Sequence, residues 1–333
     1  MVAAHEPPPA PIAPLNRSYR IAALARLSEQ DRRDIGELTE AAATHDGHRP
    51  LGEERWTHSF TMRDRRLSPV VGQACTYVTA RTRQGWDDPP GRRPSDLLVA
   101  FAPLTRAPGA WTLDLVVHPD HRGLAGPAVA VVQRARDAAA TCALGPVNLW
   151  VSRPSASDDG VADAAGFAPS RDLLAMRRDL PAGPTSLATR AFRPAADAEE
   201  WLAMNNRAFA GHPEQGGWTH EDLAARIATS WFDPEGLRVI EENGRIAGAC
   251  WTRIHSEDTP PSGEIYVVAT DPDFRGRGLG REIVLAGLAW LASRGLTVAR
   301  LYVDAGNTTA VALYRDLGFT VDHLDRAYSA RGT

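Results

Sequence analysis

The stretch DPDFRGRGLGREIVL, residues 271–285, places two arginines and three glycines between an apolar segment typical of a strand and one typical of a helix. The first turn of a helix carries backbone N–H groups without partners and a partial positive charge. Glycine lets a loop turn tightly and lets a ligand approach the main chain. This combination is typical of a phosphate or pyrophosphate site, with Arg275 and Arg277 adding positive charge at its rim.

Length and composition limit the classes of protein that fit. The chain has 333 residues with 43% hydrophobic residues and a formal net charge of −4, which predicts two domains and no nucleic-acid partner. No apolar run of about 18 residues predicts a membrane-spanning helix. Residues 1–16 contain no signal-peptide core and are predicted to form a disordered, Pro-rich tail. Cys75, Cys142 and Cys250 form no CxxC pair, which fits a reducing cytoplasm.

The two halves of the chain repeat one plan of alternating strands and helices. HPDHRG at 118–123 and DPDFRG at 271–276 share Pro, Asp, Arg and Gly, and a Gly-Phe pair recurs at nearly the same offset in AAGF and DLGF. Such self-similarity indicates a duplicated fold. We predict an α/β protein with an N-terminal domain at 17–181, a linker at 182–189 and a C-terminal domain at 190–333. Asn243-Gly244 predicts a hairpin turn in the second half.

Three interpretations of the glycine-rich loop compete. A tight strand-to-helix turn with exposed arginines needs no ligand. A dinucleotide site needs GxGxxG directly after a strand, with an acidic residue about 20 positions on, whereas Gly276, Gly278 and Gly280 form GxGxG and DPDFR precedes them. A P-loop is excluded because no GK[ST] follows. The third interpretation is the ArgxxGlyxGly loop of GCN5-related N-acetyltransferases (GNATs), which RGRGLG resembles.

The surrounding sequence favours the third interpretation. EIYVVAT resembles the strand that leads into this loop in GNATs, and NTTAVALYRDLGF resembles their later helix, with Asn307, Tyr314 and Gly318-Phe319. Longer segments at 205–219, 231–237, 263–280 and 301–320 resemble the mycothiol synthase family, densely over residues 190–320 and thinly in the first half. The resemblance implies two tandem GNAT domains, each a mixed central sheet flanked by helices.

The resemblance also implies a reaction, which is acetyl transfer from acetyl-CoA to the cysteinyl amine of cysteinyl-glucosaminyl-inositol, the final step of mycothiol formation. The attacking amine must lose a proton, the departing thiolate benefits from an acid, and the oxyanion needs a donor such as a strand N–H. By resemblance Glu264 is the general base, directly or through a water, and Tyr314 is the general acid. Without the resemblance, the alternative interpretation of Glu264 is a solvated carboxylate at a strand edge, and that of Tyr314 is a core residue. Strand alternation predicts that Glu264 shares a face with Tyr266 and Val268.

The cofactor-binding residues implied by the resemblance fall in three segments. They are strand residues Val268, Ala269 and Thr270, loop residues Arg275, Gly276, Arg277, Gly278, Leu279, Gly280 and Arg281, and helix-start residues Asn307, Thr308, Thr309, Ala310, Val311 and Ala312. Asn307 is also a favourable helix N-cap, so its side chain has two possible roles.

A pseudodisaccharide acceptor offers many hydroxyl groups to polar side chains. By resemblance its contacts are Glu53, Glu200, Arg253, Glu264 and Tyr302, and Arg253 stands where the family has a lysine. Because Glu53 belongs to the first half, the resemblance implies that both halves contribute to acceptor binding.

The first half lacks the catalytic pattern. RGLAGP at 122–127 aligns with RGRGLG, Trp111 falls at the position of Glu264, and Ala162 falls near that of Tyr314. We predict a degenerate, non-catalytic domain in which Gly126 can be replaced without loss of turnover. Whether Leu115, Val116 and Val117 still contact acetyl-CoA stays open.

No metal is predicted. His118 and His121 form HPDH, but the repeat places Asp271 and Phe274 at their positions, and no third ligand is visible. The expected partners are two small molecules, acetyl-CoA and the acceptor, with no nucleic acid and no membrane, for a cytoplasmic monomer. An acetyltransferase for another amine, such as an aminoglycoside or a peptide N-terminus, is one alternative. A non-catalytic acetyl-CoA-binding regulator is another, and the presence of both Glu264 and Tyr314 argues against it.

Overall fold

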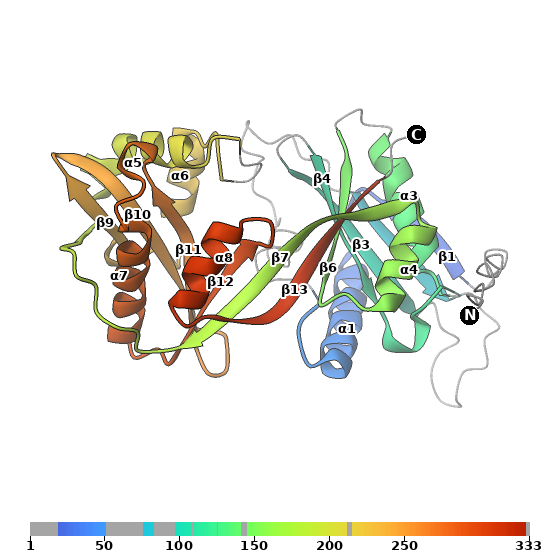
Figure 1. The fold of residues 1–333 in the computed structure, drawn as a ribbon. Coiled ribbons are helices and arrows are strands. Elements are labelled where there is room, and N and C mark those ends of the chain that lie inside the picture. The colour runs from blue at the N-terminus through green and yellow to red at the C-terminus, as the bar shows by residue number, and fades with distance from the viewer. Residues whose placement is uncertain are drawn as a thin grey trace, which may run out of the picture. The chain divides into compact units, whose positions relative to one another are not determined.

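The computed structural model describes residues 19–50, 76–82, 97–107, 110–124, 126–140, 145–211 and 215–330. The chain divides into two compact units (Figure 1). Unit 1 takes Met1–Arg171 and Asp325–Thr333, and unit 2 takes Asp172–Leu324. Of the helices in the described ranges, none is long and apolar enough to cross a membrane.

Unit 1 is a mixed sheet with helices on both faces, in the strand order β1-β2-β3-β4-β6-β13. The pair β4–β6 is parallel and its neighbours are antiparallel. Its elements are β1 (Tyr19–Leu24), α1 (Glu29–Asp46), β2 (Thr76–Thr82), β3 (Leu98–Ala107), β4 (Ala110–Asp114), β5 (Val116–Val117), η1 (Pro119–His121), α3 (Ala128–Ala140), β6 (Val147–Ser152), α4 (Ala156–Ala164) and the unit 1 parts of β7 (Phe167–Asp179) and β13 (Thr320–Ala330).

Two hydrophobic cores hold unit 1 together, one on each face of the sheet. Helix α1 begins at the Ser28–Asp31 capping box and packs its buried Ile35 and Leu38 against the strands on one face. Helix α3 packs Val131 and neighbouring apolar side chains on the other face, beside α4. The spacing of these buried residues is that of one helical face, as the sequence pattern requires.

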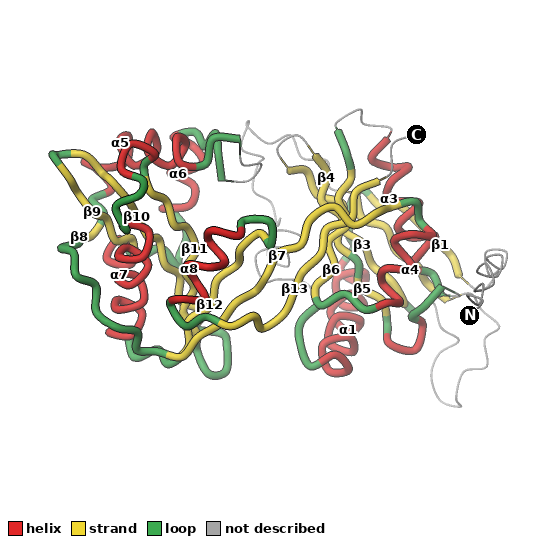
Figure 2. Tube along the Cα trace, viewed as in Figure 1, coloured by secondary structure: helices red, strands yellow, loops and turns green. Residues whose placement is uncertain are grey.

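Unit 2 repeats this plan, in the strand order β7-β12-β11-β10-β9-β8, with β11–β12 parallel (Figure 2). Its elements are the unit 2 part of β7, β8 (Arg190–Ala191), α5 (Pro194–Ala208), α6 (His220–Ile227), η2 (Pro234–Gly236), β9 (Leu237–Glu242), β10 (Arg245–His255), β11 (Ser262–Thr270), η3 (Pro272–Phe274), α7 (Leu279–Ser293), β12 (Val298–Asp304), α8 (Thr308–Asp316) and the start of β13. The observed sheets confirm the predicted α/β class.

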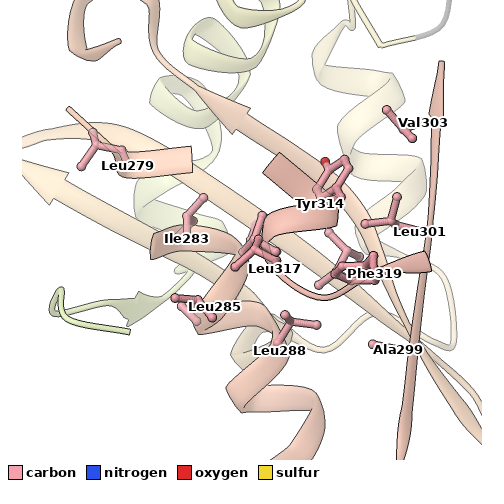
Figure 3. Packing of buried hydrophobic residues seen from close by; sticks show 14 of the residues in the cluster. Leu279, Ile283, Leu285, Leu288, Ala299, Leu301, Val303, Tyr314, Leu317 and Phe319 are labelled. Carbon is pink, nitrogen blue, oxygen red and sulfur yellow. The ribbon is translucent and has the colours of Figure 1, made fainter. Parts of the chain in front are cut away.

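The core between the sheet and helices α7 and α8 is the larger of the two in unit 2. Figure 3 shows side chains from α7, β12 and α8 meeting in it. Helix α7 can lie close to β10 because Gly287 has no side chain. A Cβ at this position would lie 2.5 Å from the Cys250 sulfur. Cys250 is a free thiol whose burial raises its pKa to about 12. Cys75 and Cys142 lie outside the described residues.

The opposite face of this sheet carries an aromatic cluster beneath α5 and α6. Trp201 of α5 contacts Trp218 and Trp251, with ring centroids 5.9 and 5.6 Å apart. Trp231 and Tyr266 contact each other at 5.2 Å and extend the cluster. These rings bury a large apolar area and fix the face of the sheet on which they lie.

The predicted hairpin is confirmed, with Asn243 at φ 54° and Gly244 at φ 74° joining β9 to β10. The predicted alternation along β11 is wrong beyond Tyr266. Trp251 pairs with Val267 but Thr252 pairs with Ile265, so Tyr266 is the extra residue of a β-bulge. Tyr266 lies with the aromatic cluster, whereas Val268 packs against the core beneath α7.

The unit boundaries differ from the boundaries predicted for the domains. The division falls inside β7 and inside β13, so each strand supplies residues to both units. Residues 182–189, predicted as a linker, lie in unit 2, where Thr185 Oγ1 and the Ser186 N–H donate to Glu282 at 2.9 and 2.6 Å. Leu187 packs against the core beneath α7. Packing and hydrogen bonds therefore hold this Gly- and Pro-containing segment.

Candidate functional site

The glycine-rich loop forms an open mouth at the start of α7. Gly276 and Gly278 have φ of 78° and 77°, a conformation that L-residues rarely adopt. The backbone N–H groups of residues 276–280 donate to no group in the part of the chain that the structure describes. These amides lie at the positive end of a 15-residue helix, where an anion site is predicted from the sequence; anion binding there stays a prediction.

Ion pairs hold the base of this loop. Asp271 is fully buried and pairs with Arg207 at 2.5 Å and Arg245 at 3.3 Å, while its side chain accepts the Asp273 N–H. Burial raises the pKa of Asp271, but the hydrogen bond from Arg207, with the other contacts, lowers it below its usual value. This ion-paired carboxylate thus holds the turn that leads into the mouth.

The arginines at the rim are only lightly engaged. Arg275 is exposed and donates to the Ala208 carbonyl at 3.4 Å. Arg277 pairs with Glu242 at 3.0 Å and lies over the Phe274 ring. Exposed ion pairs of this kind contribute little to stability, so both guanidinium groups can turn toward an anion at small cost.

Strands β11 and β12 part next to the loop. In the described structure they pair at Gly263, Glu264 and Ile265, and β11 continues to Thr270 without β12. The main chain of Val268, Ala269 and Thr270 therefore has an edge without a strand partner on that side. A strand edge of this kind offers amide and carbonyl groups to an extended ligand.

Glu264 is a mostly buried carboxylate in a hydrogen-bonded chain. Its side chain is 12% exposed, and Oε2 lies 2.6 Å from Nε2 of His255. The other ring nitrogen of His255, Nδ1, lies 3.1 Å from Oε1 of Glu257. Strand register places Glu264 opposite Arg253 on β10 and Arg300 on β12. The structure therefore excludes the solvated carboxylate that Glu264 suggests when read by itself.

Tyr314 lies in the core beneath α7, and its hydroxyl forms no hydrogen bond to a residue that the structure describes. The ring is 9% exposed and packs on Phe319 at 5.9 Å, with its oxygen pointing away from that ring (Figure 3). Burial, with a smaller contribution from Cys250, raises the pKa of Tyr314, which keeps the phenol protonated.

The start of α8 shows Asn307 as its N-cap, with Oδ1 accepting the Ala310 N–H at 3.1 Å. Thr308 and Thr309 are exposed beside it, whereas the Val311 side chain faces the core. The capping interpretation of Asn307 is thus confirmed. Its contact with acetyl-CoA stays a prediction, as do those of Thr308–Ala312.

The structure brings together some of the predicted acceptor residues. Glu264, Arg253 and Tyr302 share one face of the sheet, because Glu264 is in register with Arg253 and Arg300 and Tyr302 lies two residues beyond Arg300. Glu200 lies elsewhere and accepts the Ile246 N–H at 2.7 Å. Ile246 and Arg253 are seven residues apart on β10, about 23 Å at the usual rise of a strand. Glu53 lies outside the described residues.

In unit 1 the aligned positions are filled differently. Val116 is buried, and Leu115 and Val117 pack against the core. A Cβ on Gly126 would lie 2.0 Å from the His121 carbonyl oxygen, so a larger residue there has to displace backbone, and the expected lack of effect on turnover stays a prediction. His121 Nδ1 lies 3.1 Å from the Tyr19 hydroxyl. Nowhere in the described ranges do three potential metal ligands gather.

Comparison with known proteins places this geometry in a family. Residues 198–319 match the model of the acetyltransferase (GNAT) family. The chain is 38% identical over 327 residues to the mycothiol acetyltransferase of Frankia alni, covering 92% of this chain and 93% of that relative. It is 39% identical over 302 residues to the mycothiol acetyltransferase of Thermomonospora curvata, covering 88% and 91%.

The chain belongs to the mycothiol acetyltransferase family. Solved structures confirm the predicted fold of this mycothiol acetyltransferase family member. A GCN5-related N-acetyltransferase from Sphaerobacter thermophilus aligns with a TM-score of 0.72 at 22% identity, over 94% of this chain and 97% of that one. A tandem GNAT protein from the clavulanic acid biosynthesis pathway aligns with a TM-score of 0.61 at 18% identity, over 95% and 99%.

Sequence reasoning missed two residues of the site. His255 and Glu257 were not among the predicted contacts, although His255 touches the proposed base. One signal was available in the sequence: Arg253 and His255 alternate on one face of β10, and the hairpin returns Glu264 to that face. The strand register that brings His255 to Glu264 depends on the length of the turn and on the bulge, and the sequence does not reveal it.

Proposed function

We propose that unit 2 of this mycothiol acetyltransferase family member transfers the acetyl group of acetyl-CoA to the cysteinyl amine of cysteinyl-glucosaminyl-inositol. The observation that carries the proposal is the open set of amides at 276–280, next to a strand edge that leads toward Glu264. The pyrophosphate fits the helix mouth, with Arg275 and Arg277 at its rim. The pantetheine arm fits the free edge of Val268–Thr270.

The chemical step uses groups on both faces of the sheet. Glu264 takes a proton from the acceptor ammonium, directly or through a water, and the neutral amine attacks the thioester carbonyl. A strand N–H near the parting of β11 and β12 stabilises the oxyanion. The C–S bond then breaks, and the protonated Tyr314 hydroxyl gives its proton to the thiolate.

The parted strands explain how a base and an acid on different faces can serve one carbonyl. Glu264 lies on the face with the aromatic cluster, and Tyr314 belongs to the core on the other face. Between them the sheet opens beyond Ile265, where pairing with β12 ends. The amine and the thiol can therefore meet the carbonyl from opposite sides.

Acceptor recognition is proposed for Arg253 and Tyr302, which share a face with Glu264. Tyr302 is 43% exposed, which suits a phenol that contacts sugar hydroxyls. Glu53 and Glu200 stay proposals from family resemblance, and Glu200 has to give up its hydrogen bond with the Ile246 amide to contact the acceptor.

Unit 1 is proposed to be non-catalytic. The proposed partners are acetyl-CoA and the acceptor, with no nucleic acid, membrane or metal. We also propose that the protein is a monomer in the cytoplasm.

A thiol-release assay tests the proposal. The full chain is given acetyl-CoA with cysteinyl-glucosaminyl-inositol, an aminoglycoside, a short peptide with a free N-terminus, or no acceptor. The proposal predicts rapid release of CoA with the cysteinyl pseudodisaccharide and slow release in the other arms. Preference for another amine overturns the acceptor assignment. Tight acetyl-CoA binding with no release in any arm indicates a regulator instead.

A further inference from the structure

His255 links two carboxylates and lies in neither the loop nor the acceptor surface. Its side chain is 5% exposed, whereas that of Glu264 is 12% exposed and that of Glu257 is 42% exposed. Exposure therefore increases from the ring of His255 toward Glu257, at the start of the turn between β10 and β11. The three side chains form a continuous path from Glu264 to solvent, with gaps of 2.6 and 3.1 Å.

Proton counting limits the states of this chain. A neutral imidazole has one N–H donor and one acceptor nitrogen, and an ionised carboxylate only accepts. Both ring nitrogens of His255 face carboxylate oxygens at hydrogen-bond distance. Both contacts are hydrogen bonds only if each gap holds one proton, which requires two protons in total. A neutral ring between two ionised carboxylates supplies only one, so the three side chains together must carry one further proton.

We infer that His255 positions Glu264 and, with Glu257, carries the acceptor's proton away from it. The inference rests on the proposed role of Glu264 as the base. At rest both gap protons lie on the His255 ring and both carboxylates are ionised. The amine gives its proton to Oε1 of Glu264, and the proton on Nδ1 of His255 moves to Oε1 of Glu257, which releases it to water. One proton enters and one leaves, and Glu264 is ionised again once its new proton replaces the one that the ring has lost.

The neighbouring charges are arranged around this path. Arg253 and Arg300 flank Glu264 on the two adjacent strands. Arg300 is paired with Asp258 at 2.9 Å, and Asp258 also accepts from Ser262 at 2.5 Å. These contacts hold Asp258 beside Arg300, so Glu257 is the carboxylate of this turn that lies against the His255 ring.

Activity measurements separate this relay from a structural role. Glu257→Gln keeps the shape of a partly exposed side chain but cannot take the proton. We expect kcat to fall roughly tenfold, less than the hundredfold typical for loss of a base, with both KM values unchanged. Glu235→Gln is the matched control, because Glu235 is 67% exposed and pairs only weakly with Arg238 at 3.4 Å. In a Glu264→Gln background, Glu257→Gln should cost nothing further. Independent, multiplying effects overturn the relay.

A spectroscopic measurement decides the inference without any acceptor. The full chain is labelled with [¹⁵N]histidine, and the His255 signals are assigned by their loss in His255→Gln. At the pH of the assay both ring nitrogens should carry protons in the parent chain, and only one should in Glu264→Gln. A singly protonated ring in the parent chain overturns the inference. If instead no amine is acetylated but the ring is doubly protonated, the proposed function fails and the proton arrangement stands.

Discussion

The two strand-to-helix turns of the molecule begin alike and end differently. In unit 2 Asp271 accepts the Asp273 N–H, and in unit 1 His118 accepts the Asp120 N–H. The Phe274 and His121 N–H groups both donate back across the turn at 2.9 Å. Sequence repetition in DPDFRG and HPDHRG therefore reflects a shared backbone turn, which by itself requires no ligand.

The difference begins five residues after Phe274 and His121. In unit 1 the Gly126 N–H donates to the Gly123 carbonyl at 3.1 Å, and the next residue is Pro127, which has no N–H. In unit 2 the aligned amides of Leu279 and Gly280 have no partner in the described structure. One internal hydrogen bond and one proline thus remove donors from the first helix mouth, which supports the proposal that unit 1 is non-catalytic.

The aligned arginines, Arg122 and Arg275, also differ in what they contact. Arg122 forms two 2.7 Å hydrogen bonds with Asp46 of α1 and serves the packing of unit 1. Arg275 has one contact at 3.4 Å and stays at the rim of the second mouth. Trp111 and Glu264 occupy corresponding places in the parallel strand pairs, opposite Val147 and Arg300. A buried Trp111 at the position of Glu264 and an Arg122 engaged with Asp46 both fit the proposal that unit 1 is non-catalytic.

The largest effect is expected at the position of the base. Glu264→Gln keeps the size of the side chain and removes the proton acceptor, so turnover at neutral pH should fall about 10²-fold or more. The loss should shrink at high pH, where the acceptor amine is already neutral. Steady-state thiol release from pH 6 to 10 measures both, and unchanged turnover at pH 7 contradicts the assignment.

The matched change in unit 1 is Trp111→Phe. Trp111 is 2% exposed and its buried Nε1 has no hydrogen-bond partner in the described structure, so phenylalanine removes an unsatisfied donor and little packing. Turnover should stay within about twofold of the parent chain. A large loss here, with Glu264→Gln mild, assigns the chemistry to the other unit.

Removal of the proposed acid should cost less than removal of the base. Tyr314→Phe deletes a hydroxyl without a described partner, so the core should hold and the melting temperature should change little. We expect kcat to fall about tenfold or more, since the thiolate then leaves without a proton. Comparing acetyl-CoA with a thioester of a more acidic thiol tests the role, because the variant should lose less with the better leaving group.

Gly276 and Gly123 give a matched test of the two loops. Both have positive φ, 78° and 94°, and a Cβ at either site meets no atom within 4 Å. Alanine should therefore strain both loops equally, by roughly 1–2 kcal/mol. Gly276→Ala should weaken acetyl-CoA binding about tenfold, and Gly278→Val should weaken it further, whereas Gly123→Ala should leave it unchanged. Calorimetric titration compares them, and equal losses in both units contradict the proposed division of roles.

The smallest effect concerns stability. The Arg122 hydrogen bonds lower the pKa of Asp46 to about 2. A lowered pKa stabilises the fold above about pH 4, and this contribution is lost as the pH falls toward 2. Arg122 is 37% exposed, so solvent screening limits the effect, and Asp46→Asn should lower the free energy of unfolding by only about 1 kcal/mol at pH 7. Denaturant titrations at pH 7 and pH 3 should show the difference shrinking, with turnover unchanged.

Local signals in the sequence predicted much of the fold. The Asn243-Gly244 turn, the glycine-rich helix mouth and the repeated loop letters each depend on a few adjacent residues, and the structure contains all three. Turn chemistry and helix starts are encoded locally, so short motifs suffice for them.

Features that depend on register or on distant pairing could not be predicted in this way. The bulge at Tyr266 changes which face Val268 occupies, and no letter marks it. The Glu200 side chain was expected at the acceptor but bonds to Ile246 through tertiary packing. Because the two repeats carry similar strands, the sequence could not show that β7 pairs with β12. Each of these depends on strand pairing between residues far apart in the chain.

Hydrogen–deuterium exchange on the two loops tests the central claim most directly, because both are read in one sample. The account predicts that acetyl-CoA slows amide exchange across residues 276–280, whose N–H groups are open, and leaves residues 122–128 unchanged. Protection confined to residues 122–128, with none at 276–280, would contradict the claim that the second helix mouth holds the pyrophosphate.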